Sequence, residues 1–147
     1  MSNVITEWRQ AVMGQLEQNL QAGAFAGNVL AGERDGVSRD RNLACVFASP
    51  LVTDGGNVNF ARPVLIVRAW VARPKTPAAS EPRDPEPVEQ LMLDLAACLQ
   101  QIQRPQLPSA LDGFYSFVTQ IRPDYDDWGV EATLQGWTGN PAVRSVT

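Results

Sequence analysis

The sequence predicts an α+β fold in which a mixed or antiparallel β-sheet carries two α-helices packed on one face. Two segments repeat apolar residues at the three- and four-residue spacing of a helix. Other segments alternate apolar and polar residues, as half-buried strands do. The 147 residues, of which 44% are hydrophobic and 19% charged, suffice for one domain with its own core.

The first predicted element is an amphipathic helix over residues 3–21. Ser2 or Asn3 is its natural N-cap, and Gly23 and Gly27 end the pattern. The apolar stripe of this helix consists of Ile5, Trp8, Val12, Leu16 and Leu20.

Three strands are predicted next. A short strand is expected over 29–31, and a strand buried on both faces over 43–48, ended by Pro50. The residues 54–57 indicate a turn, and the clearest strand of the chain follows over 63–71. In that strand Leu65, Val67, Ala69 and Val71 face one way, and Val64, Ile66, Arg68 and Trp70 face the other.

A proline-rich arm is predicted over residues 74–87, since five prolines fall between residues 73 and 87. Proline lacks the amide donor that a sheet or helix interior needs, so the segment is expected to form a long exposed loop or extended arm. It is either a passive linker or a contact that reaches a neighbouring subunit. The second use is favoured because a stiff arm loses little entropy on docking.

The second helix follows directly, with Pro87 at its first position and an apolar stripe from Val88 to Ile102. Two more strands are expected, over 114–121 and 128–137. We therefore predict a single domain over residues 1–141 and a flexible tail over 142–147.

Composition argues against several classes of function. The chain has no histidine, which removes the commonest general base and metal ligand, so no enzyme activity and no cofactor are expected. A net charge of −4 without a basic run disfavours nucleic-acid binding. No apolar segment has the length of a membrane span, and the first residues do not resemble a signal peptide, so a soluble protein made in the cytoplasm is expected.

Two small groups of residues are candidates for metal binding or thiol chemistry. Asp124, Asp126 and Asp127 resemble part of a calcium loop, but the glycine and glutamate of that motif are missing, so a solvated hairpin turn with Arg122 balancing its charge is favoured. Cys45 and Cys98 lie among apolar neighbours and are expected to be free, buried thiols.

Arg68 and Trp70 share one face of the clearest strand. An exposed Trp beside an Arg is typical of an interface anchor. The alternative is that Trp70 packs under a helix while Arg68 reaches the edge of the sheet. Trp137 raises the same question, because it lies opposite the buried residues of the last strand.

The order of elements resembles the tail terminator proteins of long-tailed bacteriophages. The similarity extends over residues 3–140 as an order of elements, without a diagnostic motif, and the excess of Arg over Lys fits phages of high-GC hosts. It includes the N-terminal helix, the strand Leu65–Val71, the arm, the helix that begins Val88-Glu89-Gln90-Leu91 and the last strand Val130–Trp137.

The resemblance implies a hexameric ring in the virion, at the neck-proximal end of the tail, that caps the tail tube and joins the head. Its partners would be further copies of itself, the major tail tube protein and a head-completion or neck protein. DNA would pass its lumen only as cargo, past an acidic and repulsive wall. The candidate subunit contacts are Arg68, Trp70, Arg73 and Lys75.

Other functions remain open at this point. Within the same class, the chain could be another neck ring protein (a stopper or an adaptor) or a minor tail protein. From different classes, it could be a small metal-dependent enzyme that uses Asp124, Asp126 and Asp127, or a monomeric module that displays the proline arm.

Overall fold

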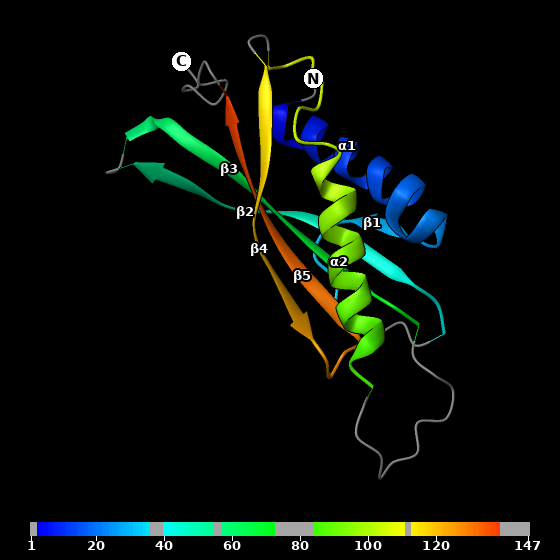
Figure 1. Ribbon diagram of the computed structural model, residues 1–147. Coiled ribbons are helices and arrows are strands. Elements are labelled where there is room, and N and C mark those ends of the chain that lie inside the picture. Colours follow the sequence, from blue (N-terminus) through cyan, green and yellow to red (C-terminus); the bar gives the residue numbers. More distant parts are fainter. Residues whose placement is uncertain (1–2, 36–39, 55–56, 73–83, 111–112, 139–147) are drawn as a thin grey trace.

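A computed structural model describes residues 3–35, 40–54, 57–72, 84–110 and 113–138. These residues form two α-helices, one short 3₁₀ helix and a five-stranded sheet, so the predicted α+β fold is confirmed (Figure 1). In chain order the elements are α1 (Val4–Asn19), η1 (Leu20–Gly23), β1 (Val29–Ala31), β2 (Leu43–Asp54), β3 (Asn57–Trp70), α2 (Glu86–Gln100), β4 (Phe114–Asp124) and β5 (Gly129–Thr138).

The sheet is mixed, with the strand order β1-β2-β3-β5-β4. β1 runs parallel to β2, and every other pair of neighbours is antiparallel. β3 is the central strand, because it pairs with β2 on one side and with β5 on the other. In the register of β3 and β5, Trp70 lies opposite Gly129 and Val64 lies opposite Gln135.

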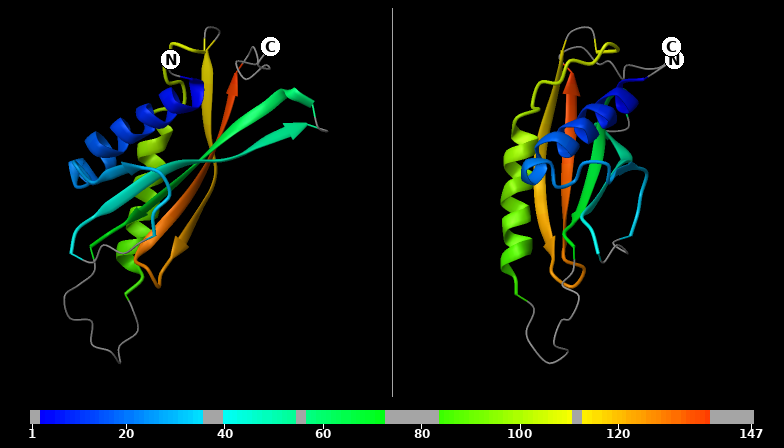
Figure 2. Two further views of the ribbon diagram at one scale, coloured as in Figure 1. Left: turned by 180° about the vertical axis from the view of Figure 1, so that it is seen from behind. Right: turned by 90° about the vertical axis from the view of Figure 1, so that its right-hand side faces the viewer.

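Both helices pack on the same face of the sheet and share one core with it (Figure 2). The Trp8 indole of α1 packs 4.9 Å from the ring of Phe114 and donates a hydrogen bond of 3.1 Å to the buried Ser116 hydroxyl. The side chain of Gln15 joins the helices by donating to the Cys98 carbonyl at 2.9 Å. The strand residues of this core include Ala44, Val46, Leu65, Val67, Ala69, Val130, Ala132 and Leu134.

Helix α1 begins as predicted, because the Asn3 side chain accepts a hydrogen bond from the Thr6 amide at 2.8 Å. The buried stripe differs at its first position. Val4 is buried while Ile5 is only partly so, because the register of the helix turns Val4 toward the core. The remainder of the predicted stripe, from Trp8 to Leu20, is buried.

Helix α2 begins at Glu86, one residue before the predicted Pro87, which lies second in the first turn, where proline is tolerated because that amide has no partner within the helix. It ends at Gln100, so Ile102 lies beyond the helix and not in its last turn. The amide of Ile102 donates instead to the Leu99 carbonyl in a turn.

The prediction that Pro50 ends the second strand is wrong, since β2 continues to Asp54. The β2–β3 register shifts between Ser49 and Val52, and β1 pairs with β2 only as far as Val46. Pro50 therefore occupies an irregular edge, where a missing amide donor costs no sheet hydrogen bond. The partner strand β3 starts at Asn57, earlier than the predicted Pro63.

The last hairpin is also longer than predicted. β4 extends to Asp124, and the turn consists of residues 125–128. The alternation predicted for the last strand is confirmed, because Val130, Ala132 and Leu134 are all buried.

Most of the predicted arm 74–87 and the whole of the predicted tail 142–147 lie outside the described residues. Among the described helices, none is long and apolar enough to cross a membrane.

Candidate interaction surface

The sheet face opposite the two helices carries the candidate site. Its β2–β3 half holds a small second cluster of buried residues, formed by Leu43, Cys45 and Trp70, with Phe47 packed against it. The Arg34 carbonyl accepts hydrogen bonds from the Cys45 thiol at 4.0 Å and from Arg68 at 3.3 Å. The segment that follows β1 therefore contacts this half of the face.

Arg68 is held in place from several sides. Its Nε donates to the Glu131 carboxylate at 2.9 Å, and its guanidinium lies 5.0 Å from the centre of the Phe47 ring. The hydrogen bond with Glu131 raises the pKa of Arg68, which favours the charged guanidinium. Arg122 also contacts Glu131, at 3.5 Å, so the partner shown for its charge is the carboxylate that Arg68 also uses.

The predicted contact residues fall in different places. Arg68 remains 28% exposed at its side chain. Trp70 is only 4% exposed and belongs to the cluster on the face opposite the helices, so it is neither an exposed interface anchor in the single chain nor packed under a helix. Its indole packs over Gly129, where a Cβ would lie 2.3 Å from Cδ1 of Trp70. Arg73 and Lys75 lie outside the described residues.

The β4–β5 half of the same face is aromatic and exposed. Tyr115 lies 6.1 Å from Phe117 and 5.6 Å from Trp137, measured between ring centres. Phe117 is 47% exposed and Trp137 44%. The Arg104 guanidinium lies 4.9 Å from the centre of the Tyr115 ring. We call Arg104, Tyr115, Phe117 and Trp137 the aromatic patch.

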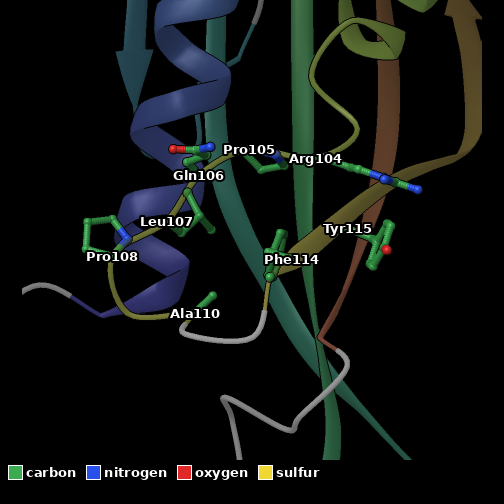
Figure 3. Close-up of a pocket in the computed structure, with 9 residues that line it drawn as sticks. Arg104, Pro105, Gln106, Leu107, Pro108, Ala110, Phe114 and Tyr115 are labelled. Atoms are coloured by element: carbon green, nitrogen blue, oxygen red, sulfur yellow. The ribbon is translucent and has the colours of Figure 1, made fainter.

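A cleft of about 610 Å³ borders the aromatic patch, and Arg104 and Tyr115 belong to both (Figure 3). Figure 3 shows the Arg104 side chain extending past the Tyr115 ring, and the other lining residues Phe114 and Leu107 are buried. Among the described lining residues, the side chains are apolar apart from Arg104, Gln106 and Tyr115, so the cleft offers a largely apolar binding surface. The remaining lining residues are Pro105, Pro108, Ala110 and Gly113.

Sequence reasoning singled out Trp137 but missed the rest of the aromatic patch. Tyr115 and Phe117 alternate with buried Phe114 and Ser116 along β4, so their spacing placed them on the opposite face. No pattern in the sequence placed Arg104 on this face. It follows α2 in the sequence, and only the fold brings it over Tyr115.

Two of the three aspartates, Asp126 and Asp127, lie in the turn as predicted. Asp124 ends β4, and its carboxylate accepts a hydrogen bond from the Asp127 amide at 3.3 Å. Among the described residues, no group of three side chains of the types that bind metals is arranged to hold an ion.

Both cysteines are free and buried, as predicted, and they lie on opposite faces of the sheet. Burial raises the pKa of Cys98, which faces the helical core, to about 11. Burial also raises the pKa of Cys45, but a hydrogen bond with the Arg34 backbone and the Arg68 charge oppose that shift.

No known protein family matches the sequence, and no curated protein is similar to it at a meaningful level.

Proposed function

We propose that this chain is a structural virion protein, a tail terminator that caps a phage tail tube as a hexameric ring and forms the surface that joins the head. The observation that supports the proposal best is the aromatic patch, where two large aromatic side chains are about half exposed on a sheet face. Aromatic residues and Arg are enriched in protein interfaces, and they lower solubility when left in water.

A second surface supports assembly. β3 pairs with β5 only from Val64 onward, and β1 pairs with β2 only up to Val46. The outer parts of β2 and β3 therefore form a two-stranded ribbon that extends beyond the other strands (Figure 1). Its backbone edges have no partner strand within the described residues, and such edges can pair with another chain.

These two surfaces differ from each other, which favours a heterologous contact between copies. A heterologous contact that closes on itself gives a ring. In the proposed mechanism, one face of that ring binds the last subunits of the tail tube, and the opposite face lacks the contacts that further tube subunits need. In this mechanism acidic side chains, which give the chain its net charge of −4, line the lumen and repel the phosphates of the passing DNA.

The deciding experiment is particle mass by light scattering over a range of concentrations, followed by negative-stain imaging with and without purified tail tubes. We expect a species of six times the 16.1 kDa of one chain, and rings at one end of each tube. A protein that stays monomeric at every concentration and does not bind tube ends would refute the proposal. Rings that bind heads but not tubes would instead favour a stopper or an adaptor.

The enzyme alternative has a simple test. If Asp124, Asp126 and Asp127 bound a divalent cation, Mg²⁺ or Ca²⁺ at a hundred times its Kd would stabilise the fold by about 2.7 kcal/mol. We expect no rise in Tm with either ion, because the turn already uses the Asp124 carboxylate for the Asp127 amide. A rise that is lost in Asp127→Asn would restore the enzyme alternative.

A further inference from the structure

The aromatic patch and the ends of the proline-rich segment lie at opposite ends of the sheet. Residues 73–83 connect the end of β3 to the start of α2. The end of β3 lies at Trp70, which pairs with Gly129 at the start of β5. The aromatic patch lies near the other end of β5, where Trp137 pairs with Tyr115.

The segment is too short to reach the aromatic patch of its own chain. Gly129 and Trp137 are separated by about 27 Å, at ~3.4 Å per strand residue. Residues 73–83 must leave from and return to the same end of the sheet. Even fully extended at ~3.6 Å per residue, such a loop projects only about 20 Å. Contact between the segment and the Tyr115–Trp137 pair therefore requires a second copy of the chain.

The chemistry of the segment fits the aromatic patch. Proline-rich chains adopt polyproline II with little loss of entropy, and their rings dock on grooves lined by aromatic side chains. Cations also bind aromatic faces. The segment carries both kinds of group, and its one carboxylate, Glu81, can pair with Arg104. Its prolines and cations are Pro74, Pro77, Pro82, Arg73, Lys75 and Arg83.

We infer that residues 73–83 of one copy bind the aromatic patch of the next copy, with proline rings against Tyr115, Phe117 and Trp137 and with Glu81 against Arg104. The cleft of about 610 Å³ beside Tyr115 provides the concave wall for this contact. Because the ends of the segment and the aromatic patch lie at opposite ends of the sheet, the contact repeats head to tail, as a closed ring requires. The inference thus rests on the proposed ring and specifies one of its subunit contacts.

A crosslinking experiment tests the contact directly. One chain carries Ser80→Cys in the segment, and a second carries Gln135→Cys, which lies opposite Phe117 in the sheet. The native Cys45 and Cys98 are 0% and 3% exposed, so they compete little for oxidation. The control partner carries Leu93→Cys on α2, where the side chain is 66% exposed.

We expect the Ser80→Cys chain to form a disulfide with the Gln135→Cys chain at least about ten times faster than with the Leu93→Cys chain, because binding raises the effective concentration of the two thiols. Equal rates would overturn the inference. A disulfide formed within one chain that carries both Ser80→Cys and Gln135→Cys, at concentrations where it is monomeric, would overturn it too.

Binding strength gives the second readout. Trp137→Ala and Glu81→Gln should each weaken self-association, by about tenfold or more for the tryptophan, while Leu93→Ala should not change it. Each variant is first checked for an unchanged circular dichroism spectrum and Tm. If wild-type rings form and both variants still assemble with unchanged affinity, the inference fails and the ring stands. If the disulfide forms as expected but the assemblies are open chains, the inference stands and the ring fails.

Discussion

The two faces of the sheet differ in how their residues are buried. On the helical face, Leu65, Val67 and Leu134 are fully buried beneath α1 and α2. On the opposite face, the buried residues are Val64 and the small cluster of Leu43, Cys45 and Trp70 among those the structure describes, while Phe117 and Trp137 remain about half exposed. One face thus supplies the core that the fold requires, and the other keeps apolar surface that the isolated chain does not use.

Because of this difference, substitutions on the two faces should affect different quantities, namely the stability of the fold and the association of copies. Substitutions on the helical face should change the free energy of unfolding. Substitutions in the aromatic patch should leave that free energy nearly unchanged and alter association.

Two tryptophans provide the largest contrast. Trp8→Ala removes a fully buried indole and its hydrogen bond to Ser116, so we expect a loss of about 3–5 kcal/mol. Trp137→Ala should cost less than about 1 kcal/mol, because its indole is 44% exposed. Urea unfolding measures both. Similar losses for the two variants would show that the aromatic patch belongs to the structural core.

Gly136 tests how closely the helical face is packed. A Cβ at this position would lie 2.4 Å from the ring of Phe114 and 3.0 Å from Pro63, so Gly136→Ala should destabilise by about 1–3 kcal/mol. The matched control is Gly14→Ala in α1, where no atom lies within 4 Å. That control should stabilise the helix by up to about 1 kcal/mol. A neutral Gly136→Ala would mean that Phe114 can move aside.

Cys98 and Cys45 lie on opposite sides of the sheet, and each should affect how the free energy of unfolding depends on pH. An unfolded Cys98 ionises near its ordinary pKa of 9.0, whereas the folded thiol stays neutral to about 11. Stability should therefore be unaffected below pH 9.0 and decrease as the pH rises toward 11, by up to about 1.4 kcal/mol per pH unit. Unfolding of Cys98→Ala at increasing pH should show a shallower decrease than wild type. Cys45→Ala should flatten the curve less, since Arg68 favours its thiolate.

The Arg68–Glu131 pair should have the smallest effect. Both side chains are partly exposed, at 28% and 27%, so solvent screens their attraction. A double-mutant cycle with Arg68→Ala and Glu131→Ala should give a coupling energy of about 0.5–1 kcal/mol that decreases in high salt. A salt-independent coupling of several kcal/mol would identify this half of the face as a second structural core.

Much of the fold was predictable from local patterns. The stripe from Trp8 to Leu20 located α1, and the alternation from Val130 to Leu134 located the last strand and its buried side. Pro50 misled the prediction, because whether a proline ends a strand depends on whether its edge is paired. That pairing is a property of the sheet and cannot be read from neighbouring residues.

The candidate site was less predictable than the fold. Alternation placed Tyr115 and Phe117 opposite the buried side of their strand, but the aromatic patch also needs Arg104 and Trp137. Those residues come from different segments, and only the pairing of β4 with β5 and the return of the chain after α2 bring them together.

By itself the sequence determined the class of fold, the two helices and the side of each strand that is buried, because these follow from the periodicity of apolar residues along one segment. The tertiary structure alone decided that Trp70 is buried without a helix above it, while Trp137 stays exposed. Both lie on the same sheet face, and the difference arises because neighbours distant in sequence, including Leu43 and Cys45, pack against Trp70. Burial of a given side chain is set by what packs against it, and that depends on contacts between distant segments.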